Sequence, residues 1–125
     1  MQATKREAGE LILRTNDASR MLRILANQKR LLILYVLARH GEVSVSILAA
    51  EIDLGMSALS QHLAKLRGDG LVEARKEGHQ VFYRVGSQSV ARILDALMDL
   101  DLMPRSTNEM TKGKQAHGDS QYHGR

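Results

Sequence analysis

Apolar residues recur at helical spacing through the first third of the chain. Between residues 10 and 25 they return every three or four positions, which predicts a first amphipathic helix. A second helix is predicted over residues 28–40, with Asn27 as its N-cap and Gly41 at its end. Its stretch RLLILYVLA is apolar nearly all round, so we expect this helix to lie at the centre of the core.

The next segment has the pattern of two short helices joined by a tight turn. Val43 favours a short strand, and Ser44 is a suitable cap for a helix over residues 45–53. Gly55 marks the turn, and another helix is predicted over residues 56–67. Two helices with so short a connection predict a helix-turn-helix.

Residues 71–85 no longer follow a helical period. The strand-forming sequences LV and VFY lie on either side of the polar, glycine-containing sequence KEGH, which predicts a two-stranded hairpin with an exposed tip. Ser87 or Ser89 then caps a last helix that runs to about residue 102, and Pro104 stops it. The whole pattern predicts a mainly α fold with a small β-hairpin.

The polar ends of the chain set the expected domain boundaries. Residues 1–9 are predicted to be a flexible N-terminus, and residues 10–103 a single domain. Residues 104–125 are polar, contain glycine and are almost free of aliphatic side chains, so we expect a disordered tail.

Composition narrows the possible classes of protein. The 125 residues carry a formal net charge of +4, which is compatible with a polyanionic partner. The absence of cysteine excludes a disulfide framework, a thiolate metal site and a thiol redox sensor. No apolar run reaches the roughly 20 residues that span a bilayer, and the first residues lack the apolar stretch of a signal peptide. We therefore expect a cytoplasmic protein without a membrane partner.

The helix predicted over residues 56–67 has an unusual outer face. Leu59, Leu63 and Leu66 form one narrow apolar stripe that would pack against the preceding helix. The opposite face is short, polar and uncharged, whereas a helix that merely faces water usually carries Lys and Glu. Small polar side chains allow a helix to lie close to a partner, and the major groove of DNA admits one helix. The alternative is an exposed amphipathic helix in a small bundle.

On the DNA-binding interpretation, this second helix of the helix-turn-helix is the recognition helix. Gln61 can pair with an adenine edge, Met56 can touch a thymine methyl group, and the basic residues further along suit phosphates. The candidate DNA-binding residues of the recognition helix are Met56, Ser57, Ser60, Gln61, His62, Lys65 and Arg67.

A hairpin directly after a helix-turn-helix predicts a winged helix, with the hairpin as the wing. Arg75, Lys76 and His79 would lie over the minor groove or its phosphates. Glu73 and Glu77 dilute the positive charge of the wing, and the alternative interpretation of these residues is a solvated loop.

The segment from the predicted helix-turn-helix to the hairpin resembles the DNA-binding core of the ArsR/SmtB family of small bacterial repressors. The resemblance is carried by the series SALSQHL…LR…GLV…R…G…VFY. ILANQKRLLILYVL resembles the family's second helix and its entry, so the resemblance covers roughly residues 18–102. It implies a winged helix-turn-helix homodimer that binds double-stranded DNA at a palindromic operator and represses transcription. The chain departs from the family at Gln28, where Pro is common, and at Gly55-Met56, where Ser-Gln is frequent.

Many members of that family release DNA when a metal binds. Their usual ligands are cysteines, or Asp and His residues on the last helices, and this chain has no cysteine and no histidine on its predicted last helix. We therefore expect no metal and no cofactor, as in the metal-independent, nodulation-repressor-like branch of the family. A zinc-responsive repressor is the alternative, and His117, Asp119 and His123 form a weak pattern for it.

The first and last predicted helices carry more apolar surface than a small monomer needs. A single winged helix reads few base pairs, and a specific site needs two of them, spaced about one helical turn of DNA apart, so we expect the surplus to form a two-fold interface. The alternative is that these residues close the monomer core. The candidate interface residues are Leu11, Leu13, Val90, Ile93, Leu94 and Leu97.

Other functions find little support in the residues. No nucleophile–base pair, glycine-rich phosphate loop or carboxylate pair points to an enzyme. A winged-helix module that binds protein instead of DNA is the remaining alternative, because the predicted recognition helix is not strongly basic.

Overall fold

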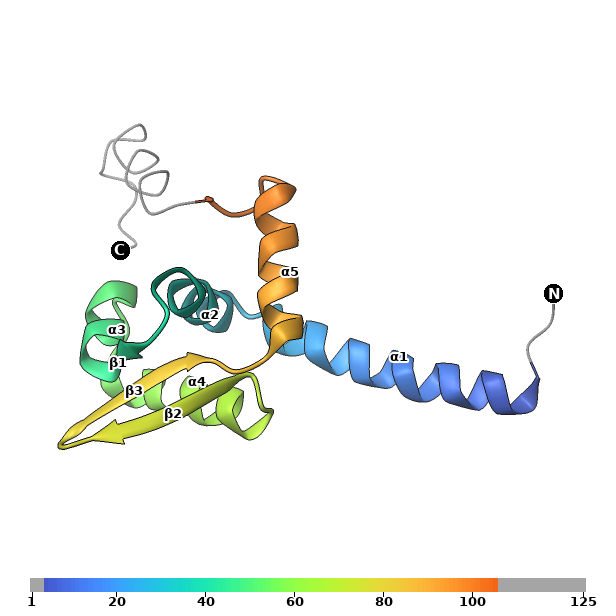
Figure 1. Ribbon diagram of the computed structural model, residues 1–125, viewed down its shortest axis with the longest axis horizontal. Coiled ribbons are helices and arrows are strands. Elements are labelled where there is room, and N and C mark those ends of the chain that lie inside the picture. Colours follow the sequence, from blue (N-terminus) through green and yellow to red (C-terminus); the bar gives the residue numbers. More distant parts are fainter. Residues whose placement is uncertain (1–3, 106–125) are drawn as a thin grey trace.

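The computed structural model describes residues 4–105, and its elements follow the predicted order (Figure 1). Residues 106–125, most of the expected tail, lie outside the described part. The helices are α1 (Lys5–Leu25), α2 (Gln28–His40), α3 (Val45–Ile52), α4 (Met56–Gly68) and α5 (Gln88–Asp99), and the strands are β1 (Val43–Ser44), β2 (Val72–Glu77) and β3 (Gln80–Val85).

Helix α2 lies at the centre of the core, as its apolar sequence predicted. Ile33, Leu34 and Leu37 are each 0% exposed, and they belong to one apolar cluster with residues from every other helix and from β1 and β2. Burying each such side chain contributes about 1.5–3 kcal/mol, so the other elements are held in place mainly by their contact with this cluster. Asn27 caps α2 by accepting a hydrogen bond from the Arg30 N–H at 3.0 Å.

The strands form one antiparallel sheet in the order β1-β3-β2. Strand β1 is two residues long and pairs Val43 with Tyr83 and Ser44 with Phe82. The hairpin of β2 and β3 turns at Gly78-His79, where Gly78 has φ +63°. A glycine with positive φ at the first central position is what a two-residue type II′ turn requires.

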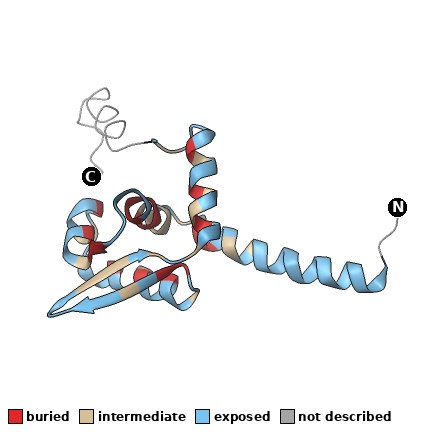
Figure 2. Ribbon diagram, in the orientation of Figure 1, coloured by how far each residue is buried: buried red, intermediate tan, exposed pale blue. Residues whose placement is uncertain are grey.

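Helix α1 begins at Lys5, so the prediction that it starts near residue 10 was wrong. The Glu7 N–H donates to the Thr4 hydroxyl at 3.1 Å, and the Thr4 N–H donates to the Glu7 carboxylate at 2.9 Å. This capping box stabilises the first turn, and the apolar period could not reveal it because the first residues are polar. The helix extends away from the body, and only Ile24 and Leu25 at its end are buried (Figures 1 and 2).

Helix α5 is capped by Ser87 and ends at Asp99, before the predicted end near residue 102. The Asp101 N–H donates to the Met98 carbonyl at 3.0 Å, and the Leu102 N–H donates to the Leu97 carbonyl at 2.8 Å. Asp101 has φ +61°, so the end is a Schellman motif formed without glycine.

The chain after α5 returns to α2. The Tyr35 hydroxyl, on a side chain only 1% exposed, donates to the Pro104 carbonyl at 2.7 Å. Within residues 4–105, none of the helices combines the length and the apolar character that crossing a bilayer demands.

Candidate nucleic-acid interface

Helices α3 and α4 form the predicted helix-turn-helix. The Ser44 hydroxyl caps α3 by accepting from the Ile47 N–H at 3.3 Å, and Asp53 ends the helix in the left-handed conformation at φ +60°. Helix α4 then begins after Gly55, which provides no side-chain cap. Leu48 and Ile52 of α3 are buried in the same cluster as the leucines of α4, so the two helices share the core.

The two faces of α4 are divided as the sequence predicted. Leu59, Leu63 and Leu66 are 0%, 2% and 0% exposed. Met56 is exposed at the start of the helix, His62 is half-buried, and the small polar face is open to solvent. The exposed residues of this face are Ser57, Ser60, Gln61 and Ala64.

The two basic residues of α4 differ in their partners. Lys65 Nζ lies 3.4 Å from Asp69 Oδ2, a buried oxygen atom of a half-buried side chain that has no hydrogen-bond partner in the described part of the chain. Arg67 is exposed and has no ion-pair partner within residues 4–105. Arg67 therefore carries the more available positive charge for a phosphate.

A hollow of about 460 Å³ lies between α4 and β3. Ser60, Ala64 and Arg67 line it from α4, and Tyr83 lines it from β3. Tyr83 was not among the candidate site residues. The period-two alternation of β3 could have placed it on the same face as Val81 and Val85, but nothing in the sequence indicates that this face meets α4.

The three candidate residues of the wing do not share one face of the sheet. Lys76 lies on the same face as Ala74, and Ala74 pairs with Tyr83 beside α4. Lys76 is exposed and has no ion-pair partner in the described part of the chain. Arg75 is on the opposite face, because successive side chains of a strand alternate. His79 is exposed at the turn.

Arg75, which the sequence predicted to lie over the minor groove or its phosphates, is held by two carboxylates. Its Nε and Nη2 donate to the two oxygens of Glu42 at 3.0 and 2.8 Å, and its Nη1 donates to Glu77 at 2.6 Å. The guanidinium carbon lies 4.9 Å from the centroid of the Phe82 ring. Hydrogen bonds from Arg75 lower the pKa of Glu42, and the two carboxylates raise the pKa of Arg75.

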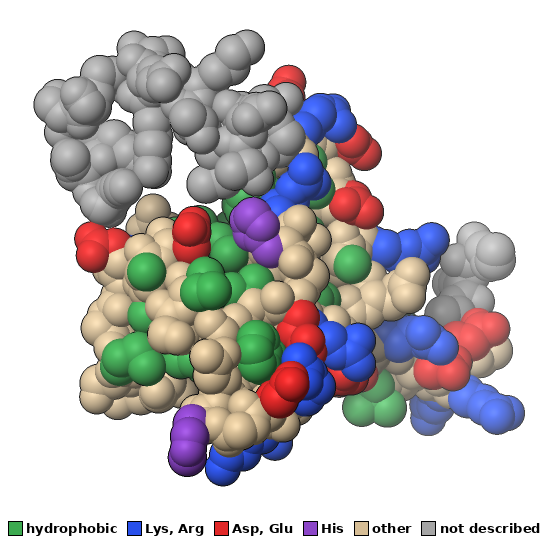
Figure 3. Space-filling model, turned by 60° about the vertical axis from the view of Figure 1, so that its left-hand side comes forward, with side chains coloured by type: hydrophobic (Ala, Val, Ile, Leu, Met, Phe, Trp, Pro, Cys, Tyr) green, Lys and Arg blue, Asp and Glu red, His purple; other side chains and the backbone are tan. Residues whose placement is uncertain are grey.

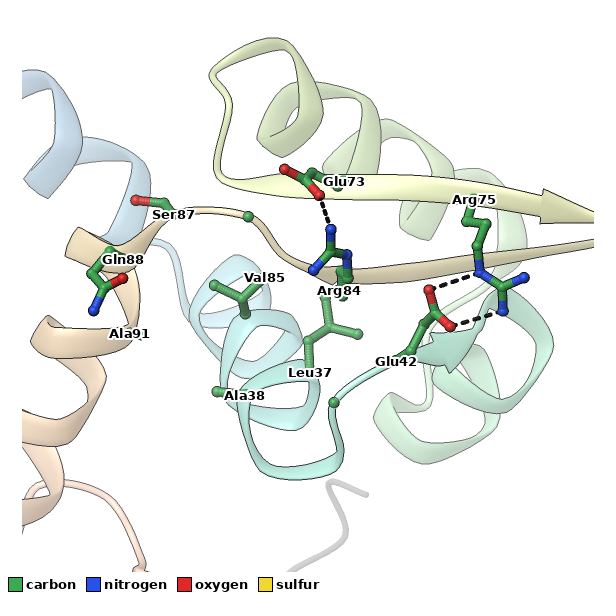
Figure 4. Close-up of a pocket in the computed structure, with 12 residues that line it drawn as sticks. Leu37, Ala38, Glu42, Glu73, Arg75, Arg84, Val85, Ser87, Gln88 and Ala91 are labelled. Carbon is green, nitrogen blue, oxygen red and sulfur yellow. Dashed lines mark hydrogen bonds and ion pairs between the residues drawn. The ribbon is translucent and has the colours of Figure 1, made fainter.

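The charged face of the sheet borders a second hollow, of about 810 Å³, next to the start of α5 (Figure 4). Arg75 and its neighbour Arg84 both point toward carboxylates there: Arg84 pairs with Glu73 at 2.5 Å on the adjacent strand. Acidic and basic side chains intermingle on this part of the surface (Figure 3). The local charge is therefore largely compensated, unlike that beside α4.

The candidate dimer residues fall into two groups. Val90 and Leu94 are 0% and 1% exposed within a single chain, so the prediction that they form the interface was wrong. They close the protomer core because α5 turns that face toward it. Ile93 and Leu97 are half-buried, whereas Leu11 and Leu13 are 63% and 66% exposed on the projecting helix.

Residues 4–105 contain no group of three or more His, Cys, Asp or Glu side chains that could hold a metal ion. Asp99, one of the acidic residues near the end of α5, forms an ion pair with Arg105 at 3.1 Å. His117, Asp119 and His123, the weak zinc pattern, lie outside the described residues.

A helix-turn-helix followed by an antiparallel hairpin defines the winged helix-turn-helix class of protein. The family model described as "Bacterial regulatory protein, arsR family" matches residues 27–74. The chain is 45% identical to the nodulation protein NolR of Rhizobium meliloti, over 66% of this chain and 67% of that protein. It is 47% identical to the transcriptional activator HlyU of Vibrio cholerae serotype O1, over 62% of this chain and 70% of that protein.

A solved structure adds a dimeric relative. The homodimeric winged helix-turn-helix DNA-binding domain of Mb0332 from Mycobacterium bovis has a TM-score of 0.63 and 33% sequence identity, and the match covers 79% of this chain and 87% of that one. The protein belongs to the arsR family of bacterial regulatory proteins. This confirms the family resemblance and the winged-helix fold that the sequence indicated.

Proposed function

We propose that the protein is a transcriptional repressor that binds a palindromic operator as a homodimer in the cytoplasm. The observation that carries this proposal is the exposed, uncharged polar face of α4, which is beside the positive charge of Arg67, while the exposed Lys76 is on the sheet face that Tyr83 shares. A face of this kind can approach base edges closely, while flanking cations bind phosphates. The family membership supports the same conclusion.

The recognition helix supplies the sequence preference. Gln61 reads an adenine edge through its amide, and the hydroxyls of Ser57 and Ser60 accept or donate according to the base. Met56, 53% exposed, provides an apolar contact for a thymine methyl group. Lys65, Arg67 and, on the half-buried side, His62 contact phosphates and so fix the position of the helix.

The wing contributes through its face toward α4 and through its tip. Lys76 contacts a phosphate, and His79 at the turn lies over the adjacent groove. Arg75 is left out of this direct interface, because its guanidinium already binds two carboxylates on the opposite face.

Dimerisation brings two such surfaces to successive turns of the DNA. The exposed apolar side chains of α1, together with Ile93 and Leu97 of α5, are available for a second copy. Leu11 and Leu22 lie eleven residues apart, which is about three helical turns, so they share one stripe of α1. Leu22 is 59% exposed and was not among the candidate residues.

The experiment is fluorescence anisotropy with the DNA upstream of the protein's own gene, with excess unrelated duplex and a salt series. We expect competitor-resistant binding that weakens steeply as salt rises. Replacing Ser57, Ser60 and Gln61 by Ala should abolish the preference for this DNA over unrelated duplex, while the variant still binds duplex DNA in general. Gln88→Ala combined with Ser89→Ala is the matched control, because these exposed residues carry the same polar groups on α5.

Full preference in the triple variant would refute the assignment of α4 as the recognition helix. Binding to no tested promoter would favour a winged helix that binds protein. Release of DNA by added zinc would favour the metal-responsive alternative. A reporter gene behind the bound promoter tests the direction of control, and activation in place of repression would overturn that part of the proposal.

A further inference from the structure

Arg75 connects the wing strand β2 to the segment before β1, a strand with which β2 does not pair. In the sheet order β1-β3-β2, the two-residue strand β1 and the wing strand β2 both pair with β3 and not with each other, and Val72 at the start of β2 is buried in the core. Glu42 directly precedes β1, at the end of the loop from α2. The Arg75 side chain starts on β2, reaches across β3 and binds Glu42 on the far side (Figure 4). Its guanidinium lies over the Phe82 ring of β3.

This bridge has the geometry of a specific contact. Arg75 and Glu42 are 33 residues apart, and they meet as a bidentate pair in which two N–H groups reach both carboxylate oxygens. A guanidinium fork restricts orientation as well as distance, and the aromatic ring beneath it adds a cation–π attraction. Glu77 binds the remaining side of the guanidinium. Arg84 and Glu73 differ from this arrangement, because they pair across two strands that are already joined by backbone hydrogen bonds.

We propose that Glu42 and Arg75 are positioning residues that fix the angle of the wing to the helix-turn-helix, and that Arg75 does not contact DNA. The wing angle determines where Lys76 and His79 meet the DNA. The proposal rests on the DNA-binding function proposed above. On this proposal, removal of the Glu42 carboxylate weakens DNA binding. If Arg75 contacted DNA directly, removal of that carboxylate would release Arg75 and strengthen DNA binding.

The variants are Glu42→Gln, Arg75→Met, Arg75→Lys and the double variant Glu42→Gln with Arg75→Met. Glu42→Gln removes a charge but keeps the shape, and Arg75→Lys keeps the positive charge but cannot form the fork. Arg84→Met is the control for removal of one cation from the same face of the sheet. Lys76→Met is the control for removal of a cation that binds a phosphate.

Two measurements are made on each full-length variant. Hydrogen exchange of the β2 and β3 amides reports how firmly the wing is held, and anisotropy with the upstream duplex over a salt series reports affinity and the number of phosphates bound. We expect faster wing exchange and about two- to fivefold weaker binding for Glu42→Gln, Arg75→Met and Arg75→Lys, as for a well-formed surface pair. The double variant should be no weaker than either single variant, because both remove the same interaction.

The salt dependence separates the two roles of a basic residue. Removing one cation that binds a phosphate lowers the slope of log affinity against log salt by about 1. Lys76→Met should therefore lower the slope, while the three single variants of Arg75 and Glu42 leave it unchanged. Arg84→Met should leave wing exchange unchanged. Tighter binding by Glu42→Gln with a lower slope for Arg75→Met would overturn the proposal, because it would show that Glu42 withholds Arg75 from DNA.

Failure of this proposal can be told apart from failure of the proposed function. Unchanged wing exchange in Glu42→Gln and Arg75→Met overturns the positioning role whatever the DNA results. Faster exchange with unchanged DNA affinity also overturns it. If the wild-type protein binds neither the upstream duplex nor unrelated duplex, the DNA-binding function fails, and the exchange data alone then decide whether Glu42 and Arg75 hold the wing.

Discussion

The proposed dimer depends on apolar side chains of α1 that a single chain leaves in solvent, and Leu22→Ala tests this directly. Leu22 is 59% exposed, so association can still bury more than half of its side chain. Full burial of a leucine contributes about 1.5–3 kcal/mol, and the exposed part therefore corresponds to about 1–2 kcal/mol. A two-fold interface contains the residue twice, so the substitution should weaken the dimer by about 2–4 kcal/mol, or about 30- to 700-fold in Kd.

The assay is sedimentation equilibrium over a range of protein concentrations, followed by DNA anisotropy. Alanine has the highest helix propensity, so the substitution does not destabilise α1 itself, and circular dichroism should show unchanged helix content. Ile47→Ala is the matched control, because Ile47 is 57% exposed on α3, away from the projecting helix. Leu22→Ala should bind the upstream DNA more weakly at concentrations where it is monomeric. Equal dimer affinity for Leu22→Ala, Ile47→Ala and the wild type would refute the assignment of the interface to α1.

Three further predictions concern single contacts. Tyr35→Phe removes the hydrogen bond to the Pro104 carbonyl and should lower the free energy of unfolding by about 1 kcal/mol in urea titrations, whereas an unchanged midpoint would contradict its structural role. Gly78→Ala forces an L side chain to a φ of +63°, and thermal unfolding should show a loss of about 1–2 kcal/mol without any steric clash, since nothing lies within 4 Å. Hydrogen bonding by Arg75 lowers the pKa of Glu42 from 4.5. The ion pair between Glu42 and Arg75 is therefore complete above about pH 4.5 and breaks as the pH falls through the lowered pKa. The protection of the wing amides against hydrogen exchange, relative to their intrinsic rates, should fall over the same range, and Glu42→Gln should remove this fall.

The local features of this protein could be predicted because neighbouring residues determine them. The leucine spacing of α4 specifies which face is buried, since a helix places every third or fourth residue on one side. Ser44 and Asn27 mark helix starts because their side chains accept hydrogen bonds from N–H groups only three residues away. The hairpin follows from strand formers on either side of a glycine-containing turn.

The errors at the ends of helices also have a local cause. Helix α1 starts earlier than its apolar pattern because Thr4 and Glu7 cap a polar first turn. Helix α5 ends earlier because Asp101 adopts a positive φ that is usual for glycine but uncommon for other residues. An apolar period locates the buried part of a helix, whereas capping and backbone conformation set its ends.

The sequence by itself determined the helix-turn-helix, its polar outer face and the wing, because each depends on a period or a cap within a few residues. Only the tertiary structure decided which apolar residues of α5 remain available for a dimer interface. Val90 and Leu94 are buried in the protomer core together with residues of α2. The tertiary structure also decided the surroundings of Arg75, whose charge is bound by Glu42 from 33 residues away across an intervening strand. Alternation tells which residues of a strand share a face, but what that face meets depends on how distant segments pack.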